Sequence, residues 1–283
     1  MATTSTTRGL TSELQKGSQL DQQAKAKKRA ERRSKWIWRL AGYAFFIGLW
    51  QFSSTYLVED FILPAPLTIL EEMREIVSTG LLVEHFGATL EKIAIGFAIA
   101  FVVGSAVGLL MGTNRWWEAF FSDWVLLMMT TPGLIFVLVA VMIFGLAYIG
   151  PVVAVAVTGF PYIAVNLVEG VKAAPKDLND MARAYGVSRF NHLRHVLIPF
   201  LAPFIFTAVR YGFSVAWKVA TLTEVIAGNE GIGFMMRTEF QTFSMAGMLS
   251  WVLLFFAFAL FLERVVLQRQ IDRFFRWRPE VTA

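Results

Sequence analysis

The chain has 283 residues, of which 56% are hydrophobic and 17% are charged, and its formal net charge at pH 7 is +5. Soluble globular domains usually contain about 45–50% apolar and about 25% charged residues. The composition therefore excludes disorder, a fibrous repeat or a nucleic-acid module as the main character of the chain. The absence of cysteine excludes disulfides, thiolate metal sites and cysteine nucleophiles. The apolar excess predicts a protein whose solvent is lipid.

The apolar stretches predict an all-α polytopic membrane protein with about six transmembrane helices. A spanning helix needs about 20 mostly apolar residues, and Gly and Pro mark the natural breaks between such helices. The candidate spans are Trp36–Leu57, Ile93–Gly112, two helices between Asp123 and Glu169 that are joined near residues 145–151, one helix over about Pro199–Thr223, and one helix between Glu239 and Glu263.

The basic residues predict the orientation of these spans. If the N-terminus is inside, 21 of the 26 Lys and Arg residues fall in cytoplasmic segments, as expected because Lys and Arg in short loops stay on that side. We therefore expect a multi-pass protein of the bacterial cytoplasmic (inner) membrane with both termini in the cytoplasm. The predicted parts are a disordered basic tail over residues 1–35, a transmembrane domain over residues 36–267, and a basic tail over residues 268–283.

The second predicted span carries small residues at a spacing of four. This spacing places them on one helix face, where a neighbouring helix can approach closely. We expect a packing role for these residues rather than a catalytic or phosphate-binding one. The residues are Gly96, Ala100, Gly104, Gly108 and Gly112.

A polar connector over residues 169–198 separates the fourth and fifth spans. Pro175 suits a first helical position, and Asp177 places negative charge in the first turn. Gly186 supplies the left-handed residue that ends this helix, and Ser188 can cap a second short helix. The connector is predicted to be a cytoplasmic helix–turn–helix, which is either a surface for a cytoplasmic partner or a connector that packs on itself.

The connector resembles the cytoplasmic signature of binding-protein-dependent ABC importer permeases. That signature reads Glu-Ala-Ala, three residues, Gly, nine residues and then Ile-x-Leu-Pro. The chain has Asp180-Met181-Ala182, Gly186 and, after nine residues, Val196-Leu197-Ile198-Pro199. The surrounding sequence looks like the sulfonate, taurine and nitrate branch of the family over roughly residues 40–275. The supporting motifs include Leu63-Pro64-Ala65-Pro66, Phe160-Pro161-Tyr162, Ala216-Trp217 and Gly231-Ile232-Gly233.

The resemblance implies the partners of the chain. In such importers the short cytoplasmic helix docks on a separate ATPase subunit, and this role passes to the matching positions Asp180, Ala182, Arg183 and Gly186. The chain has no phosphate-binding Gly-x-x-x-x-Gly-Lys-[Ser/Thr] loop. We therefore expect no enzyme activity and no cofactor in this chain, with ATP and Mg²⁺ bound by two copies of the ATPase. A second permease copy and an extracytoplasmic substrate-binding protein complete the expected importer for a small anionic solute. The alternative is a secondary transporter or channel for a small anion.

Charged residues inside the fifth span mark a candidate substrate path. Arg210, Ser214 and Lys218 are four residues apart and so share one helix face. Charges at membrane depth usually face a cavity or a partner, so this face is either a cationic lining for an anion or a contact that holds helices together. A further alternative is that Lys218 snorkels to the outer surface. Glu224, at the outer end of the span, is a possible gate residue by resemblance and equally a capping or ion-pair residue.

The sequence favours neither a metal centre nor a catalytic site. His192 and His195 are three residues apart, but no acid or third ligand is spaced to complete a zinc site. No combination of serine, histidine and carboxylate indicates nucleophilic catalysis.

Overall fold

The computed structural model describes residues 34–145, 148–175, 177, 180–181 and 184–262, and within these ranges its regular elements are helices without strands. The predicted all-α class is confirmed for this part of the chain. The chain divides into two units, Met1–Leu67 and Thr68–Ala283. The predicted tail over residues 268–283 lies outside the described residues, as does the tail over residues 1–35 except for Ser34 and Lys35.

The first unit contains one long helix, over residues 34–56, where the first span was predicted. Its large apolar side chains are mostly exposed, including Trp38 at 76% and Phe46 at 70%. The turn after this helix is held by Trp50, whose Nε1 donates to the carbonyl oxygen of Pro64 over 3.2 Å. A helix that exposes so much apolar surface within its own unit is suited to lipid or to a partner chain.

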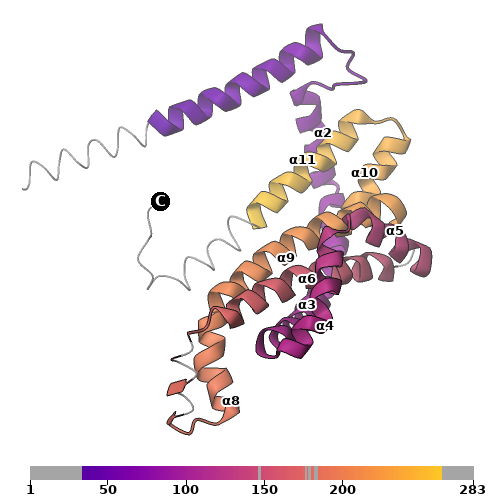
Figure 1. The fold of residues 1–283 in the computed structure, drawn as a ribbon. Helices are drawn as coiled ribbons and strands as arrows, with labels where there is room; N and C mark the ends of the chain where they lie inside the picture. Colours follow the sequence, from indigo (N-terminus) through magenta and orange to yellow (C-terminus); the bar gives the residue numbers. More distant parts are fainter. Residues whose placement is uncertain (1–33, 146–147, 176, 178–179, 182–183, 263–283) are drawn as a thin grey trace, which may run out of the picture. The chain divides into compact units, whose positions relative to one another are not determined.

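The second unit is built from helices that follow one another along the chain (Figure 1). In order these are α2 (Pro66–Ser78, whose first two residues belong to the first unit), α3 (Leu81–Thr113), α4 (Arg115–Thr130), α5 (Gly133–Phe144), α6 (Ile149–Lys172), α8 (Arg189–His192), a π-helical segment η1 (Leu193–Leu197), α9 (Ile198–Ala227), α10 (Ile232–Gln241) and α11 (Met245–Phe261).

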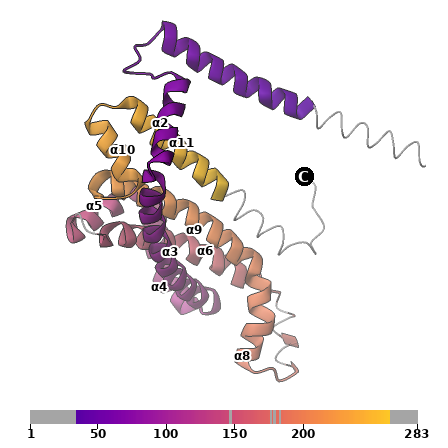
Figure 2. The same ribbon diagram turned by 180° about the vertical axis from the view of Figure 1, so that it is seen from behind.

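Three long helices form the centre of this unit. Helix α6 packs along α3 on one side and along α9 on the other, as the two views in Figures 1 and 2 show. Buried apolar side chains from all three, including Ala100, Ile163 and Ala208, fill the space between them. Among the described residues, three helices are long and apolar enough to cross a membrane, namely α3, α6 and the helix over Arg194–Ala227.

Helix α6 approaches α3 closely along the face of small residues, as the spacing of these residues predicted. A Cβ atom on Gly104 would lie 2.6 Å from the carbonyl oxygen of Phe160, and one on Gly108 would lie 2.7 Å from that of Ala164. Real Cβ atoms are not found at such distances. The packing role of this face is therefore confirmed, because the α6 backbone occupies the space that a side chain would need.

The third predicted span is interrupted in the structure. Helix α4 ends at Thr130 and α5 begins at Gly133, and the two helices are bent by 96° relative to each other. Pro132 cannot donate a backbone hydrogen bond, and it forces the preceding Thr131 out of the helical region, with ψ at 128°. The expectation of one continuous helix before residue 145 was therefore wrong, and the pair counts as at most one bent span.

The break near residues 145–151 is confirmed. Gly145 ends α5 with φ at 69°, a backbone conformation that favours glycine. Helix α6 then begins at Ile149.

Helices α2, α10 and α11 lie at the end of the second unit opposite α8 (Figure 1). Helix α2 buries Ile69 and Ile76, and the carbonyl oxygen of Ile69 accepts a hydrogen bond of 3.1 Å from Ser250 of α11. Burial and the neighbouring carboxylates of Glu75 and Glu239 raise the pKa of Glu72 on this helix. Helices α10 and α11 pack against each other and close the C-terminal end of the described chain.

Candidate functional site

The connector contains the two short helical pieces that its sequence predicts. The described positions between residues 177 and 184 are helical. Gly186 follows with φ at 64°, so the predicted left-handed glycine is confirmed. The Oγ of Ser188 then accepts a hydrogen bond of 3.3 Å from the Asn191 N–H, so the predicted cap of α8 is also present.

The four predicted coupling residues are only partly described. Asp180 and Gly186 are exposed, while Ala182 and Arg183 lie outside the described residues. A large side chain next to Gly186 is exposed as well: 83% of the surface of Tyr185 is accessible. An exposed aromatic side chain beside a helix end is typical of a surface that contacts another protein.

The basic face of α9 opens on a pocket of about 450 Å³ between α9 and α11. Arg210, Ser214 and Lys218 all line this pocket, as their spacing predicted. Among the lining residues that the structure describes, the charged ones are Arg210 and Lys218. The structure thus brings three of the four predicted path residues to one site.

Aromatic side chains form the opposite wall of this pocket. Phe255 and Phe256 of α11 line it, and Trp217 of α9 stacks on Phe255 with ring centroids 4.8 Å apart and planes at 17°. The sequence did not reveal this wall, because it depends on how α9 and α11 face each other. Only the aromatic content of residues 251–258 could have suggested it.

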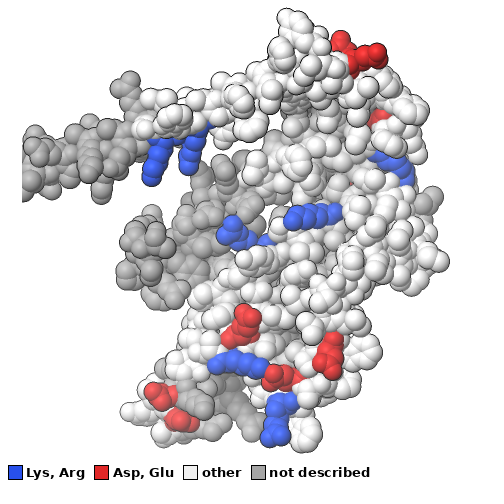
Figure 3. All heavy atoms as spheres, turned by 45° about the horizontal axis from the view of Figure 1, so that its top comes forward, with Lys and Arg blue, Asp and Glu red and all other residues white. Residues whose placement is uncertain are grey.

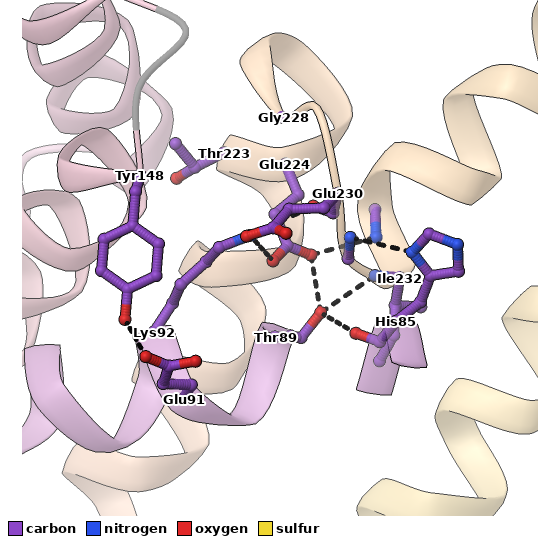
Figure 4. A network of polar contacts seen from close by, with 12 residues as sticks. His85, Thr89, Glu91, Lys92, Tyr148, Thr223, Glu224, Gly228, Glu230 and Ile232 are labelled. Atoms are coloured by element: carbon purple, nitrogen blue, oxygen red, sulfur yellow. Dashed lines mark hydrogen bonds and ion pairs between the residues drawn. The ribbon is translucent and has the colours of Figure 1, made fainter. Parts of the chain in front are cut away.

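The fourth predicted residue, Glu224, lies apart from the pocket in a buried polar network (Figure 4). Its side chain is fully buried, and its Oε1 is 3.1 Å from the Nζ of Lys92 on α3, which is also buried. Thr89 Oγ1 donates to Glu224 Oε2 over 2.9 Å. This geometry favours the ion-pair alternative for Glu224.

Backbone groups of the segment between α9 and α10 complete the network. The Gly233 N–H donates to Glu224 Oε2 over 3.1 Å, and the Ile232 N–H donates to Thr89 Oγ1 over 2.9 Å. The Gly231 N–H donates to His85 Nδ1 over 3.2 Å, as the dashed lines in Figure 4 show. Gly231 has φ at 106°, and a Cβ there would overlap the Glu224 carboxylate. The segment Gly231-Ile232-Gly233 thus wraps around a buried carboxylate.

Lys92 is the member of the network that sequence reasoning missed. It holds Glu224 and also reaches Glu230, whose carbonyl oxygen is 3.1 Å and whose Oε1 is 3.4 Å from the Lys92 Nζ. The available signal was the presence of two opposite charges directly beside the ends of two predicted spans. Lys92 and Glu224 are 132 residues apart in the sequence, so no local pattern could predict that they form a pair.

The basic residues of the pocket and of the buried network differ in their exposure to solvent. Figure 3 shows a face that is largely uncharged, with a few Lys and Arg side chains lying within the uncharged area. Arg210 and Lys218 are both exposed, whereas Lys92 is 1% exposed. Within the described ranges, no group of three His, Cys, Asp or Glu side chains could hold a metal ion.

Comparison with known proteins identifies the family. The binding-protein-dependent transport system inner membrane component family matches residues 96–277, which is more than half of the chain. The bicarbonate transport system permease protein CmpB of Synechococcus elongatus is 30% identical over 250 residues, which cover 83% of this chain and 88% of that protein. The taurine transport system permease protein TauC of Escherichia coli is 27% identical over 266 residues, covering 88% and 96% of the two chains.

Solved structures agree on the fold. The crystal structure of an amino acid ABC transporter superposes with a TM-score of 0.59 at 20% identity, covering 71% of this chain and 97% of that one. The family match and the sequence relatives favour an importer permease over the alternative of a secondary transporter or channel. The chain therefore belongs to the binding-protein-dependent transport system inner membrane components, the permeases of ABC importers, in the branch of the sulfonate, nitrate and taurine permeases.

Proposed function

We propose that two copies of this permease enclose the path of a small anionic solute that an extracytoplasmic binding protein delivers. The names of its relatives, which are permeases for bicarbonate, nitrate, sulfonates and taurine, support an anion of the sulfonate, nitrate, bicarbonate or organic carboxylate class. The positive lining at Arg210 and Lys218 agrees with that sign of charge. Two copies of a separate ATPase subunit bind ATP and Mg²⁺ and drive transport.

The proposed topology has six spans in the inner membrane with both termini in the cytoplasm. The helix over residues 34–56, α3, the bent pair α4–α5, α6, α9 and α11 supply these spans. The basic residues support this orientation because they gather in the segments that it makes cytoplasmic.

The observation that carries the coupling proposal is the exposed first helix of the connector, which ends at Gly186. It lies between α6 and α9, and those of its helical positions that the structure describes, Asp180 among them, are exposed, so an ATPase can reach it. ATP binding closes the ATPase dimer, and the connector passes that motion to α6 and α9. The solute then moves by alternating access between an outward-facing and an inward-facing cavity.

Replacing Gly186 with valine tests this role. A β-branched residue at φ 64° costs about 1–2 kcal/mol of backbone strain, so the connector helix can no longer end there. We expect Gly186→Val to reduce solute uptake strongly while the ATPase still hydrolyses ATP in the reconstituted importer. Gly186→Asn should retain uptake, because asparagine tolerates this backbone conformation.

Gly80 provides a matched control. It joins α2 to α3 with φ at 82°, and a Cβ there would meet no other atom. Gly80→Val therefore introduces similar backbone strain away from the connector and should leave hydrolysis coupled to uptake. Normal coupling in Gly186→Val, or equal uncoupling in both variants, would contradict the assignment.

A further inference from the structure

We propose that His85 forms a pH-sensitive contact: its neutral imidazole holds the α9–α10 segment closed against α3, and protonation of the imidazole releases the segment. The α9–α10 segment comprises residues 228–231, between Ala227 at the end of α9 and Ile232 at the start of α10. In the proposed topology it lies on the outer side of the membrane, so the pH that acts on it is that of the extracytoplasmic side. This control by pH is additional to the proposed transport function and does not depend on which solute is carried.

Three consecutive backbone N–H groups hold this part of the chain in place (Figure 4). The Gly231 N–H donates to His85 Nδ1 over 3.2 Å, and the Ile232 N–H donates to Thr89 Oγ1 over 2.9 Å. The Gly233 N–H donates to the buried carboxylate described above. His85 and Thr89 are four residues apart and so share one face of α3. The closed arrangement therefore requires that three side-chain groups remain hydrogen-bond acceptors.

Of these three acceptors, the imidazole is the one that protonation turns into a donor. A neutral imidazole has one N–H donor and one acceptor nitrogen, whereas a protonated imidazole has two donors and no acceptor. The Thr89 hydroxyl keeps its lone pairs, and a protonated carboxyl group still has an oxygen that accepts. Histidine is also the side chain whose ordinary charge change falls between about pH 5 and pH 8. Acid therefore acts on the contact between His85 and Gly231.

Burial makes the loss of this contact costly. Gly231 is buried and His85 is 8% exposed. The imidazole lies between the rings of Phe234 of α10 and Trp251 of α11, with centroid distances of 6.1 and 5.8 Å. Turning the protonated ring restores no acceptor, because both of its nitrogens carry hydrogen. A buried donor without a partner is unfavourable, so the segment has to move until water or another acceptor reaches the Gly231 N–H.

The charged groups around the imidazole come from α3, α9, the α9–α10 segment and α10. They are Glu84 and Lys92, Glu224, Glu230, and Arg237. Helix α11 presents the uncharged ring of Trp251. Lys92 opposes a positive charge on the closed imidazole because like charges repel. The side chain of Glu230 is 50% exposed, so this carboxylate can stabilise the protonated imidazole once the segment has moved. The closed arrangement therefore favours the neutral ring, and the open arrangement favours the charged one.

The test follows a nitroxide spin label on the α9–α10 segment of the full-length permease in phosphatidylcholine nanodiscs. The chain has no cysteine, so Asn229→Cys, at an exposed position of the segment, creates a single labelling site. Between about pH 7.5 and about pH 5, we expect the ratio of mobile to immobile label to rise about threefold to tenfold, which is the effect of one hydrogen bond. A label at Ser78→Cys, an exposed position at the end of α2, should show no such rise.

Two histidine variants separate the imidazole from other groups that titrate. His85→Asn places an amide oxygen, which accepts without titrating, close to the position of Nδ1. In this variant the label should remain immobile at both pH values. His195→Asn makes the same substitution at an exposed position of η1, and its label should respond as in the parent.

A second measurement serves if His85→Asn fails to fold. The chain has three histidines, so combining His192→Asn with His195→Asn leaves His85 as its single imidazole. NMR of ¹⁵N-labelled histidine then follows the protonation of His85 directly. The midpoint of this titration should coincide with the midpoint of the change in label mobility.

Several results would overturn the inference. These are a mobility at residue 229 that does not change with pH, an equal rise at residue 78, and midpoints that do not coincide. An equal rise in His85→Asn and in the parent would also do so, because it would assign the effect to a carboxylate. The experiment requires neither uptake nor ATP hydrolysis, so its outcome is independent of the proposed transport function.

Discussion

Charged side chains at two places on helix α9 differ in their burial. Glu224, near the end of α9, is completely buried and has an ion-pair partner, a hydroxyl donor and a backbone donor. Arg210 and Lys218, on the same helix, are exposed and line a pocket whose described lining residues are otherwise uncharged. The comparison teaches that a charge within an apolar helix can serve the fold or a ligand, and that its neighbours decide which.

The difference follows from the energetics of desolvation. A buried charge is tolerated only when its partner and hydrogen bonds replace the lost water, and removal of one partner then leaves an uncompensated charge. An exposed charge loses little on folding and can exchange water for a solute. The Glu224 network therefore contributes to stability and geometry, whereas the exposed Lys218 loses little of its hydration on folding.

Breaking the buried network should have the largest effect. Glu224→Ala leaves Lys92 buried without its main counter-charge, which destabilises a protein by about 3–5 kcal/mol. We expect this loss in the free energy of unfolding, measured by denaturant titration in mixed micelles. Glu118→Ala is the control, because Glu118 pairs with Lys172 at the surface and should contribute only about 0–1 kcal/mol. Equal losses in the two variants would remove the distinction.

Removing both charges together should have an intermediate effect. Lys92→Met combined with Glu224→Gln eliminates the unpaired charge, and the amide oxygen can still accept from Thr89 and from the Gly233 N–H. We expect the double variant to be more stable than Glu224→Gln alone, with a coupling energy of about 0.5–3 kcal/mol in a double-mutant cycle. Additive losses would show that the two side chains do not act as a pair.

Changing the pocket should have the smallest effect on stability. Lys218→Met alters an exposed side chain, so the free energy of unfolding should stay within about 0.5 kcal/mol of the parent value. The same titration measures it. A loss as large as that of Glu224→Ala would mean that Lys218 holds the fold, and it would weaken the case for a ligand site.

The predictable parts of the molecule were those set by local sequence. Helix periodicity was enough to place Arg210, Ser214 and Lys218 on one face, because the three residues are within nine positions. The left-handed glycine at Gly186 and the cap at Ser188 were predictable for the same reason. Each depends on the conformation of a few consecutive residues.

The unpredicted parts depended on contacts between distant segments. The partner of Glu224 lies 132 residues away on another helix, and no local pattern specifies that contact. The aromatic wall of the pocket likewise needs α11 to face α9. The bend at Pro132 is different, since proline is a local signal, but the long uncharged stretch around it hides the break from a count of apolar residues.

The glycine-lined contact between α3 and α6 limits where this protein can move. Side chains that interdigitate can slide or change rotamer, but at Gly104 and Gly108 the α3 backbone lies directly against the α6 backbone and the first side-chain atoms of Ile163 and Leu167. We therefore expect the two helices to move together. Any rearrangement during a transport cycle has to be absorbed at joints where the regular hydrogen bonding is already interrupted. The Thr131–Pro132 corner and the π-helical turn ahead of α9 are two such joints.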